Sequence, residues 1–166
     1  MIEANYKAFF ESLCTKKIIG HNPVQGAVRF LLYDPDFLDN WAKFDLQITH
    51  FCFLLSRPDL SIPVRSGADQ LNHPCSFLII RATDNTQTDI DAAMRDAEQK
   101  ALKFWAKLRF IQEENFHLFD QITLGDAEIK IEKIKGLSDC SAGVEVMMSL
   151  KELINYTKFY QENDWI

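Results

Sequence analysis

Residues 88–112 read TDIDAAMRDAEQKALKFWAKLRFIQ, and this stretch decides the fold. Its apolar side chains recur at alternating steps of four and three residues, at Ile90, Met94, Ala97, Ala101, Phe104, Leu108 and Ile111. This spacing places all of them along one stripe of an α-helix. At about 1.5 Å per residue the helix would be roughly 37 Å long, enough to cross a sheet of strands of ordinary length. We therefore expect a long helix that covers a β-sheet.

The start of this helix carries capping signals. Thr88 is predicted to be the N-cap, and Asp91, three residues later, is predicted to reach back as in a capping box. On the outer face, Asp91 precedes Arg95 by four residues, the spacing of helical ion pairs. Asp96 and Lys100 repeat the same spacing. These charges predict a solvated outer surface.

The rest of the chain supplies a second helix and several strands. Apolar spacing predicts an amphipathic helix over residues 2–13. Strand patterns cover residues 27–33, 44–55, 76–82, 128–132 and 144–151, and the last of these alternates most clearly. Neighbouring strands around one long helix indicate an α+β fold. We expect residues 1–166 to form a single domain with an N-terminal helix and a mostly antiparallel sheet of about five strands, covered by the long helix.

A long connection separates two of the predicted strands. Residues 57–74 contain Pro58, Pro63, Gly67, Asn72 and Pro74, with few consecutive apolar residues. A connection of this length is unusual in a compact domain and is typically functional or mobile. It is therefore a candidate for contacts with a ligand or another chain.

Composition and charge exclude several classes of function. A net charge of −6 argues against nucleic acid as the main partner, because phosphate binding needs a concentrated basic surface. The apolar runs are far shorter than the ~20 residues that span a bilayer, so we expect no membrane insertion. The first residues do not have the pattern of a secretion signal. We expect a cytoplasmic protein.

Histidines and acidic residues do not predict a metal site. His21, His50, His73 and His117 stand in none of the local spacings that bind zinc. His50 is interpreted as a structural residue within a strand, and His73 as a turn residue. The acidic cluster of Asp34, Asp36 and Asp39 lacks the glycine and the terminal glutamate of an EF-hand loop, so it is interpreted as a solvated turn. We expect no bound metal and no cofactor.

Nucleophilic and phosphate-binding motifs give no firmer support for an enzyme. Cys14, Cys52, Cys75 and Cys140 lie far apart and are expected to be free thiols. Cys75 and Cys140 are the candidates for a reactive thiol, but catalysis would need a nearby base and a lowered pKa. The chain contains no glycine-rich phosphate loop and no nucleophile elbow. The sequence favours a non-enzymatic protein, with no catalytic residue assigned.

Aromatic residues are the remaining positive signal. They make up 12% of the chain, and a group beyond the last predicted strand comprises Tyr156, Phe159, Tyr160 and Trp165. A terminal segment of this kind must fold back or dock on another subunit, and aromatic anchors are favoured at protein interfaces. We predict that these four residues form an interface.

The order of elements resembles that of small α+β proteins of bacteriophage tails, the tail-terminator and tail-completion group. The segment DCSAGVEVMMSL (residues 139–150), followed by Trp165, is similar to small proteins of prophage-like tail modules. This resemblance implies a non-enzymatic subunit that assembles into rings, with residues 57–74 making contacts between neighbours. Arg65 in that connection is the candidate contact residue. The implied partners are other copies or other tail proteins, in the cytoplasm or in a virion-like particle.

Two functions follow from these observations. The first is a structural or assembly protein that acts through protein–protein contacts and forms homo-oligomers. The second is an intracellular small-molecule-binding protein or enzyme, with a pocket between the sheet and residues 57–74. That pocket would use Cys75, His73 or Asp34.

Overall fold

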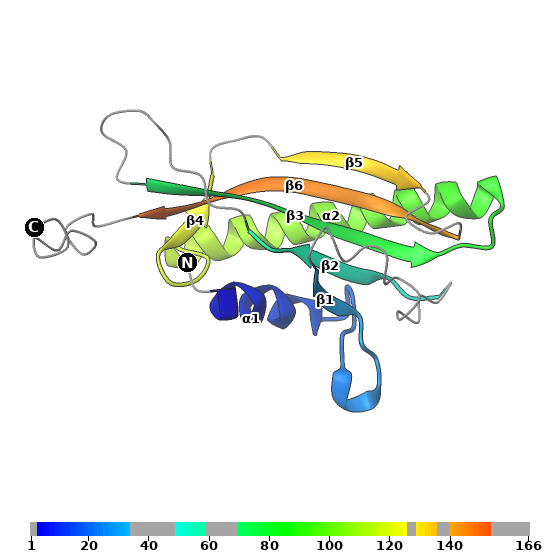
Figure 1. The fold of residues 1–166 in the computed structure, drawn as a ribbon, viewed down its shortest axis with the longest axis horizontal. Coiled ribbons are helices and arrows are strands. Elements are labelled where there is room, and N and C mark those ends of the chain that lie inside the picture. Colours follow the sequence, from blue (N-terminus) through cyan, green and yellow to red (C-terminus); the bar gives the residue numbers. More distant parts are fainter. Residues whose placement is uncertain (1–2, 34–48, 59–69, 126–128, 136–139, 154–166) are drawn as a thin grey trace, which may run out of the picture.

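Two long strands form the centre of the sheet. The computed structural model describes residues 3–33, 49–58, 70–125, 129–135 and 140–153. Strands β3 (Gln70–Ala82) and β6 (Ser141–Leu153) pair antiparallel along their whole length, from Gln70 opposite Leu153 to Ala82 opposite Ser141. All other strands are arranged around this central ladder (Figure 1).

Within the part of the chain that the structure describes, the sheet has six strands, in the order β1-β2-β3-β6, with β4 and β5 both on the far side of β6. The outer strands are β1 (Phe30–Tyr33), β2 (Cys52–Ser56), β4 (Ile122–Leu124) and β5 (Lys130–Lys135). Among the described strand pairs, only β1–β2 is parallel. The prediction of an α+β fold with a mostly antiparallel sheet is confirmed.

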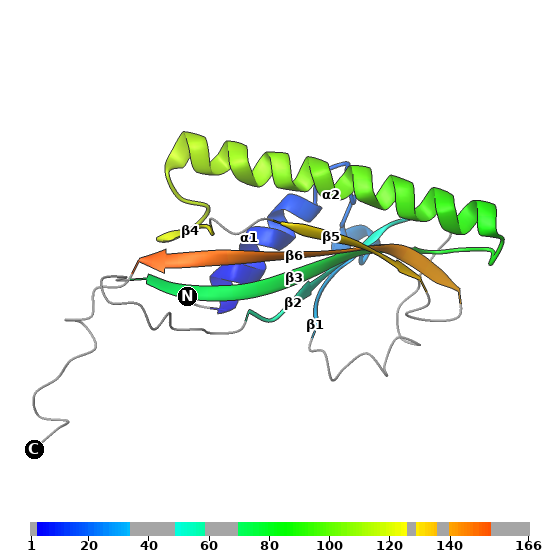
Figure 2. The same ribbon diagram turned by 90° about the horizontal axis from the view of Figure 1, so that it is seen from above.

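The long helix α2 (Gln87–Asn115) covers one face of the sheet. It runs lengthwise along β3 and β6 (Figure 2), because the short connection after Ala82 turns the chain straight back over the strand it has just left. The predicted stripe faces the sheet, with Ile90, Ala93, Ala97, Ala101, Phe104 and Leu108 buried. Met94 and Ile111 of that stripe are partly buried.

The predicted cap of α2 is wrong by two residues. Thr86, not Thr88, is the N-cap, and its side chain accepts a hydrogen bond from the backbone N–H of Asp89 at 3.2 Å. The carboxylate of Asp89 in turn accepts hydrogen bonds from both terminal nitrogens of the buried Arg81 in β3, at 2.6 and 3.1 Å. The Arg81 hydrogen bond, followed by one from the Asp84 N–H, lowers the pKa of Asp89. This bidentate pair fixes the start of α2 to the end of β3.

The predicted ion pairs on the outer face of α2 are also wrong. Asp91 accepts from the side chain of Gln87 at 2.7 Å. Lys100 does not pair with Asp96 and instead donates to the carbonyl oxygen of Ile18 at 2.7 Å. Its ammonium also lies 5.1 Å from the ring centroid of Phe51. Lys100 therefore holds the loop after the first helix instead of solvating the surface.

Helix α1 (Glu3–Cys14) confirms the predicted N-terminal helix and packs at the β1–β2 end of the sheet (Figure 1). Its buried Tyr6 and Phe10 join an aromatic core centred on Phe53 of β2. The ring centroid of Phe53 lies 4.7 Å from that of Phe77 and 4.8 Å from that of Phe104. One ring of β2 thus connects α1, β3 and α2.

Strand β3 begins six residues before the predicted strand, at Gln70. His73 and Pro74 lie within it, so the interpretation of His73 as a turn residue is wrong. Proline is tolerated in this central strand because the paired register of β2 covers only residues 77–80. The predicted 57–74 connection is correspondingly shorter, and residues 59–69 of it lie outside the described residues.

Several other predicted features can be placed. His50 lies just before β2 and not within a strand. The acidic cluster at residues 34–39 and the first part of the predicted 44–55 strand lie outside the described residues. Neither helix in the described part of the chain is long and apolar enough to cross a bilayer.

Candidate functional site

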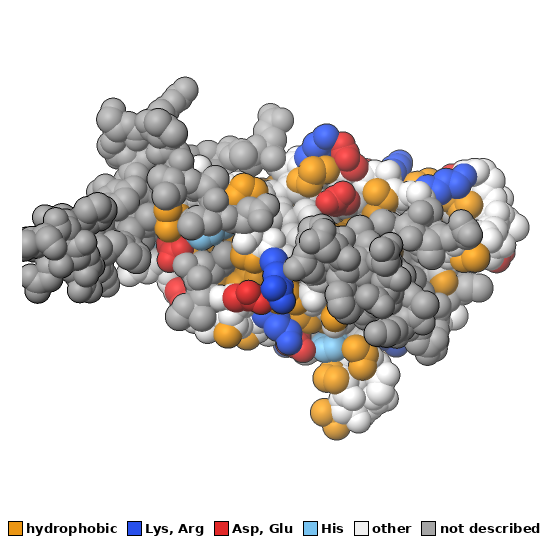
Figure 3. Space-filling view, in the orientation of Figure 1, with side chains coloured by type: hydrophobic (Ala, Val, Ile, Leu, Met, Phe, Trp, Pro, Cys, Tyr) orange, Lys and Arg blue, Asp and Glu red, His pale blue; other side chains and the backbone are white. Residues whose placement is uncertain are grey.

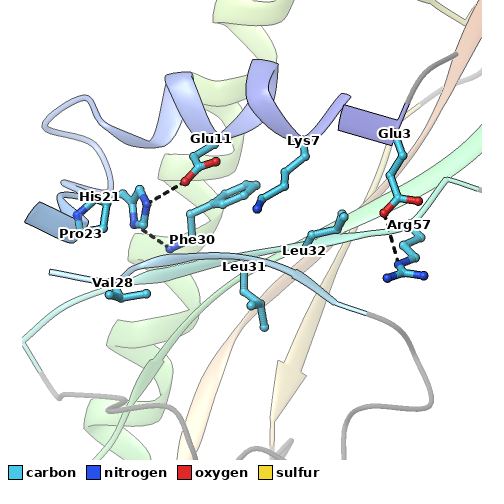
Figure 4. A pocket seen from close by; sticks show the side chains of 10 residues that line it. All are labelled: Glu3, Lys7, Glu11, His21, Pro23, Val28, Phe30, Leu31, Leu32 and Arg57. Atoms are coloured by element: carbon cyan, nitrogen blue, oxygen red, sulfur yellow. Dashed lines mark hydrogen bonds and ion pairs between the residues drawn. The ribbon is translucent and has the colours of Figure 1, made fainter. Parts of the chain in front are cut away.

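A groove runs between α1 and β1, the strand at one edge of the sheet. Its volume is about 440 Å³. The lining residues are Glu3, Lys7, Glu11, His21, Pro23, Val28, Phe30, Leu31, Leu32 and Arg57 (Figure 4). Charged side chains of α1 form one wall, and the apolar strand β1 forms the other. In the space-filling view, acidic and basic side chains gather together over α1 (Figure 3).

His21 closes one end of this groove and has a defined tautomer. Its Nδ1 accepts hydrogen bonds from the backbone N–H groups of Arg29, at 2.9 Å, and Phe30, at 3.1 Å. Because Nδ1 is an acceptor, the proton lies on Nε2, which donates to Glu11 Oε1 at 3.2 Å. The ring is only 4% exposed. With both nitrogens engaged, His21 orders the start of β1 and cannot serve as a general base in this arrangement.

The backbone of β1 points alternately towards β2 and towards the groove. The N–H of Phe53 donates to the Arg29 carbonyl at 2.8 Å, and that of Arg57 donates to the Tyr33 carbonyl at 3.3 Å. In a parallel ladder every second residue directs both backbone groups to the same neighbour. The N–H and C=O groups of Phe30 and Leu32 therefore point away from β2. The hydrogen bond from the Phe30 N–H to His21 agrees with this direction.

Three charged residues line the α1 wall at four-residue spacing. Glu11 is bound to His21, and Glu3 Oε1 lies 3.6 Å from Nε of Arg57. Lys7, between them, points into the groove (Figure 4) and makes no ion pair or hydrogen bond within the described residues. Among the described residues, the wall therefore presents one cation without a partner between two carboxylates that each have one.

The other edge of the sheet differs in composition. Strand β5 reads KIEKIK, and Lys130, Glu132, Lys133 and Lys135 are exposed. Lys130 forms an ion pair with Glu132, and Lys133 lies 3.6 Å from Glu98 of α2. Charged residues on an edge strand oppose pairing with further strands. Strand β1, with the sequence FLLY, carries no charge.

The outer face of α2 exposes apolar side chains. Leu102 is 51% exposed and Phe110 is 53% exposed, and the exposed Ala106 lies midway between them. Four-residue spacing aligns these three residues as one ridge, which we call the α2 ridge. Lys107 lies against it, with its ammonium 4.7 Å from the Phe110 ring centroid. The apolar spacing that predicts the buried stripe does not include Leu102, Ala106 or Phe110, so the α2 ridge was not predicted.

The two thiol candidates lie in different environments, because Cys75 is buried and Cys140 is exposed. None of the four cysteines, all of which the structure describes, forms a disulfide, as predicted. Burial raises the pKa of the Cys75 thiol to about 12, although a hydrogen bond with Tyr6 opposes the shift. Cys75 is therefore protonated at neutral pH and is a poor nucleophile. Cys140 is exposed, and its sulfur accepts a hydrogen bond from the Asn85 amide at 3.2 Å.

The histidines are placed apart from one another. His73 is buried on the α2 side of the sheet, and its Nε2 lies 2.8 Å from Glu152 Oε2 on the neighbouring strand β6. Within the residues that the structure describes, no group of three or more potential ligands could hold a metal ion.

The predicted interface residues cannot be placed. Arg65, Tyr156, Phe159, Tyr160 and Trp165 all lie outside the described residues. Of the residues predicted to form the alternative pocket, His73 and Cys75 lie in β3, and Asp34 is outside the described residues. Arg57, at the start of the predicted connection, lines the α1–β1 groove. The groove could not be predicted from the sequence, because His21 binds backbone groups and Lys7 belongs to the site only through its position opposite β1. No protein-family model matches the chain, and no curated protein matches it at a significant level.

Proposed function

We propose that this protein is a non-enzymatic assembly subunit that works through contacts with other copies of itself. The α2 ridge is the observation that carries this proposal. Leu102 and Phe110 each leave about half of their side chain in water on the rigid, outward face of a long helix. Apolar surface of this kind gains free energy when a second chain covers it.

The pattern of the ridge favours a second copy as the partner. Leu102, Ala106 and Phe110 form an evenly spaced large–small–large series. When two such helices pair antiparallel about a two-fold axis, Leu102 of one copy lies opposite Phe110 of the other. The two Ala106 residues meet at the axis, where small side chains allow close approach of the helices. The ridge is thus complementary to itself.

The order of elements that resembles tail-terminator and tail-completion proteins supports the same class of function. Such a role requires repeated contacts between identical or related subunits. Assignment to a phage tail is part of the proposal and rests on that resemblance. Residues 57–74 and the aromatic terminal segment would add further contacts between subunits.

Sedimentation velocity over a range of concentrations tests the proposal. We expect reversible self-association of the wild-type chain, and we expect Leu102→Gln/Phe110→Gln to raise the dissociation constant at least tenfold, about 1.4 kcal/mol. The control is Lys103→Gln/Arg109→Gln, which changes exposed residues beside the ridge and should shift the constant less than twofold. A wild-type chain that stays monomeric at about 100 μM, or equal effects of both double substitutions, would contradict the proposal.

A further inference from the structure

We propose that the α1–β1 groove binds an extended segment of another protein chain. The segment adds to the sheet as a strand beside β1 and places an acidic side chain next to Lys7. This site is separate from the α2 ridge and does not depend on self-association. Its chemistry is strand addition, in which backbone hydrogen bonds supply affinity and side chains supply specificity.

The backbone of β1 supplies the first argument. The C=O of Phe30 and both backbone groups of Leu32 point to the groove, and no pairing within the described residues uses them. The N–H of Phe30, the remaining outward group, is already bound by His21. The open hydrogen-bonding edge therefore begins just after the His21 contact, and His21 sets where an added strand can start to pair.

The composition of β1 supplies the second argument. Natural sheets protect an open edge with charges, proline, a bulge or a covering element. Strand β5 has charges, whereas the sequence of β1 is FLLY. An apolar edge strand that keeps its outward backbone groups towards a groove is a template for pairing.

Helix α1 supplies the third argument, because it forms a wall beside the edge. An added strand would lie between α1 and the free side of β1, with the side chains of one strand face pointing at α1. The charged groups on that wall are Glu3, Lys7 and Glu11. Glu11 is bound to His21 and Glu3 is paired with Arg57. Lys7 is therefore the group that can bind an acidic side chain, and an aspartate or glutamate of the incoming segment provides one.

The dimensions of the groove agree with a short segment. Strand β1 has four residues, so at about 3.3 Å per residue it offers an edge of roughly 13 Å. The groove volume of about 440 Å³ falls within the range of known ligand sites. The site thus fits three to five residues of extended chain.

A phage-displayed library of random decapeptides, selected on the full-length protein, tests the proposal. We expect the enriched peptides to share an acidic residue flanked by β-forming residues. The best peptide is then synthesised with a fluorophore and measured by fluorescence polarisation. Two N-methylated versions of the peptide are compared. Methylation of the residues whose N–H groups face β1 should abolish binding, and methylation of the residues between them should not, because only every second residue of a strand faces β1.

Two substitutions locate the peptide on the protein. Lys7→Glu should weaken binding at least tenfold, whereas Arg95→Glu, an exposed charge reversal on α2, should change it less than twofold. Leu32→Pro removes the outward N–H without removing a hydrogen bond to β2, and it should abolish binding. Amide hydrogen exchange on the wild-type protein needs no substitution, and saturating peptide should slow exchange of the Leu32 N–H more than tenfold.

Several results would overturn the proposal. The first is that no peptide is enriched on the wild-type protein more than on the Leu32→Pro variant. The second is that the enriched peptides lack an acidic residue, and the third is that N-methylation of the peptide does not change its binding. Unchanged exchange at Leu32 would have the same meaning. Free glutarate binding as tightly as the peptide would show a small carboxylate site instead. The oligomer experiment on the α2 ridge is unaffected by any of these outcomes, so the two proposals can fail separately.

Discussion

Both edge strands of the sheet have backbone groups on their outer side that could pair with another strand, but their side chains and surroundings differ. Strand β5 exposes four charged side chains along six residues, and its ion pairs connect it to itself and to α2. Strand β1 is apolar throughout and has a helix beside its open backbone groups. Each edge of this sheet is therefore protected by its own residues and neighbours, and the two edges are protected in different ways. One edge is closed by charge, and the other is left able to pair within a walled groove.

The two edges also differ in what holds them in place. β5 pairs antiparallel with β6 along its whole length, from Lys130 opposite Met147 to Lys135 opposite Ala142. β1 has a four-residue parallel pairing with β2, and its first backbone groups are held by His21. The side chain of His21 therefore orders the start of β1, whereas backbone pairing with β6 orders β5.

Removal of the His21 ring should have the largest effect on the comparison. His21→Ala leaves the N–H groups of Arg29 and Phe30 without their acceptor and creates a cavity beside buried Phe30. We expect a loss of about 2–4 kcal/mol in the free energy of unfolding, measured by urea denaturation. Asn at this position can place its Oδ1 near the site of Nδ1, so His21→Asn should recover about half of the loss.

The matched change on the other edge is Lys133→Ala, which should cost less than about 0.5 kcal/mol in the same assay. Equal losses at the two positions would show that His21 has no special role in ordering β1. Full loss in His21→Asn would show that the backbone acceptor is not the important property of the ring.

Conversion of the charged edge into an apolar one should have an intermediate effect, on association and not on folding. Lys130→Val/Glu132→Val removes one exposed ion pair and keeps the net charge at −6. We expect the fold to persist, since exposed ion pairs contribute about 0–1 kcal/mol, while light scattering shows stronger association than the parent chain has at the same concentration. An unchanged scattering profile would mean that charge does not protect this edge.

The contact between β5 and α2 should give the smallest effect. Lys133 and Glu98 are 58% and 43% exposed in their side chains, and solvent weakens their attraction. A double-mutant cycle with Lys133→Gln and Glu98→Gln should give a coupling energy below about 0.5 kcal/mol, falling further in 1 M salt. A coupling above 1 kcal/mol would show that this ion pair fastens the edge to the helix.

The elements with strong periodicity could be predicted from the sequence. The stripe from Ile90 to Leu108 and the alternation from Val144 to Leu150 each repeat over several turns or residue pairs, so core burial dictates them. The cap of α2 could not be assigned in this way, because Thr86 and Thr88 both satisfy the local rule. Thr86 is the N-cap because Arg81 of β3 binds Asp89 and so fixes where the helix starts.

The candidate groove is a different kind of feature. Nothing in the sequence near His21 or Lys7 has a motif spacing, since His21 binds backbone groups and Lys7 is defined by the strand it faces. The prolines at residues 57–74 predict a loop. Pro74 could instead enter β3, because β2 ends before reaching it. Such outcomes depend on neighbours that are distant in the chain.

The central β3–β6 ladder has a consequence for how the chain reaches its native state. Strand β6 is the last element in the described sequence, and α2, β4 and β5 all separate it from β3. Contacts between such distant segments form slowly, because the entropy of closing a long loop must be overcome first. On the ribosome, β3 must therefore wait for its principal partner, and a chaperone that shields residues 70–82 during that interval would raise the yield of correctly folded protein.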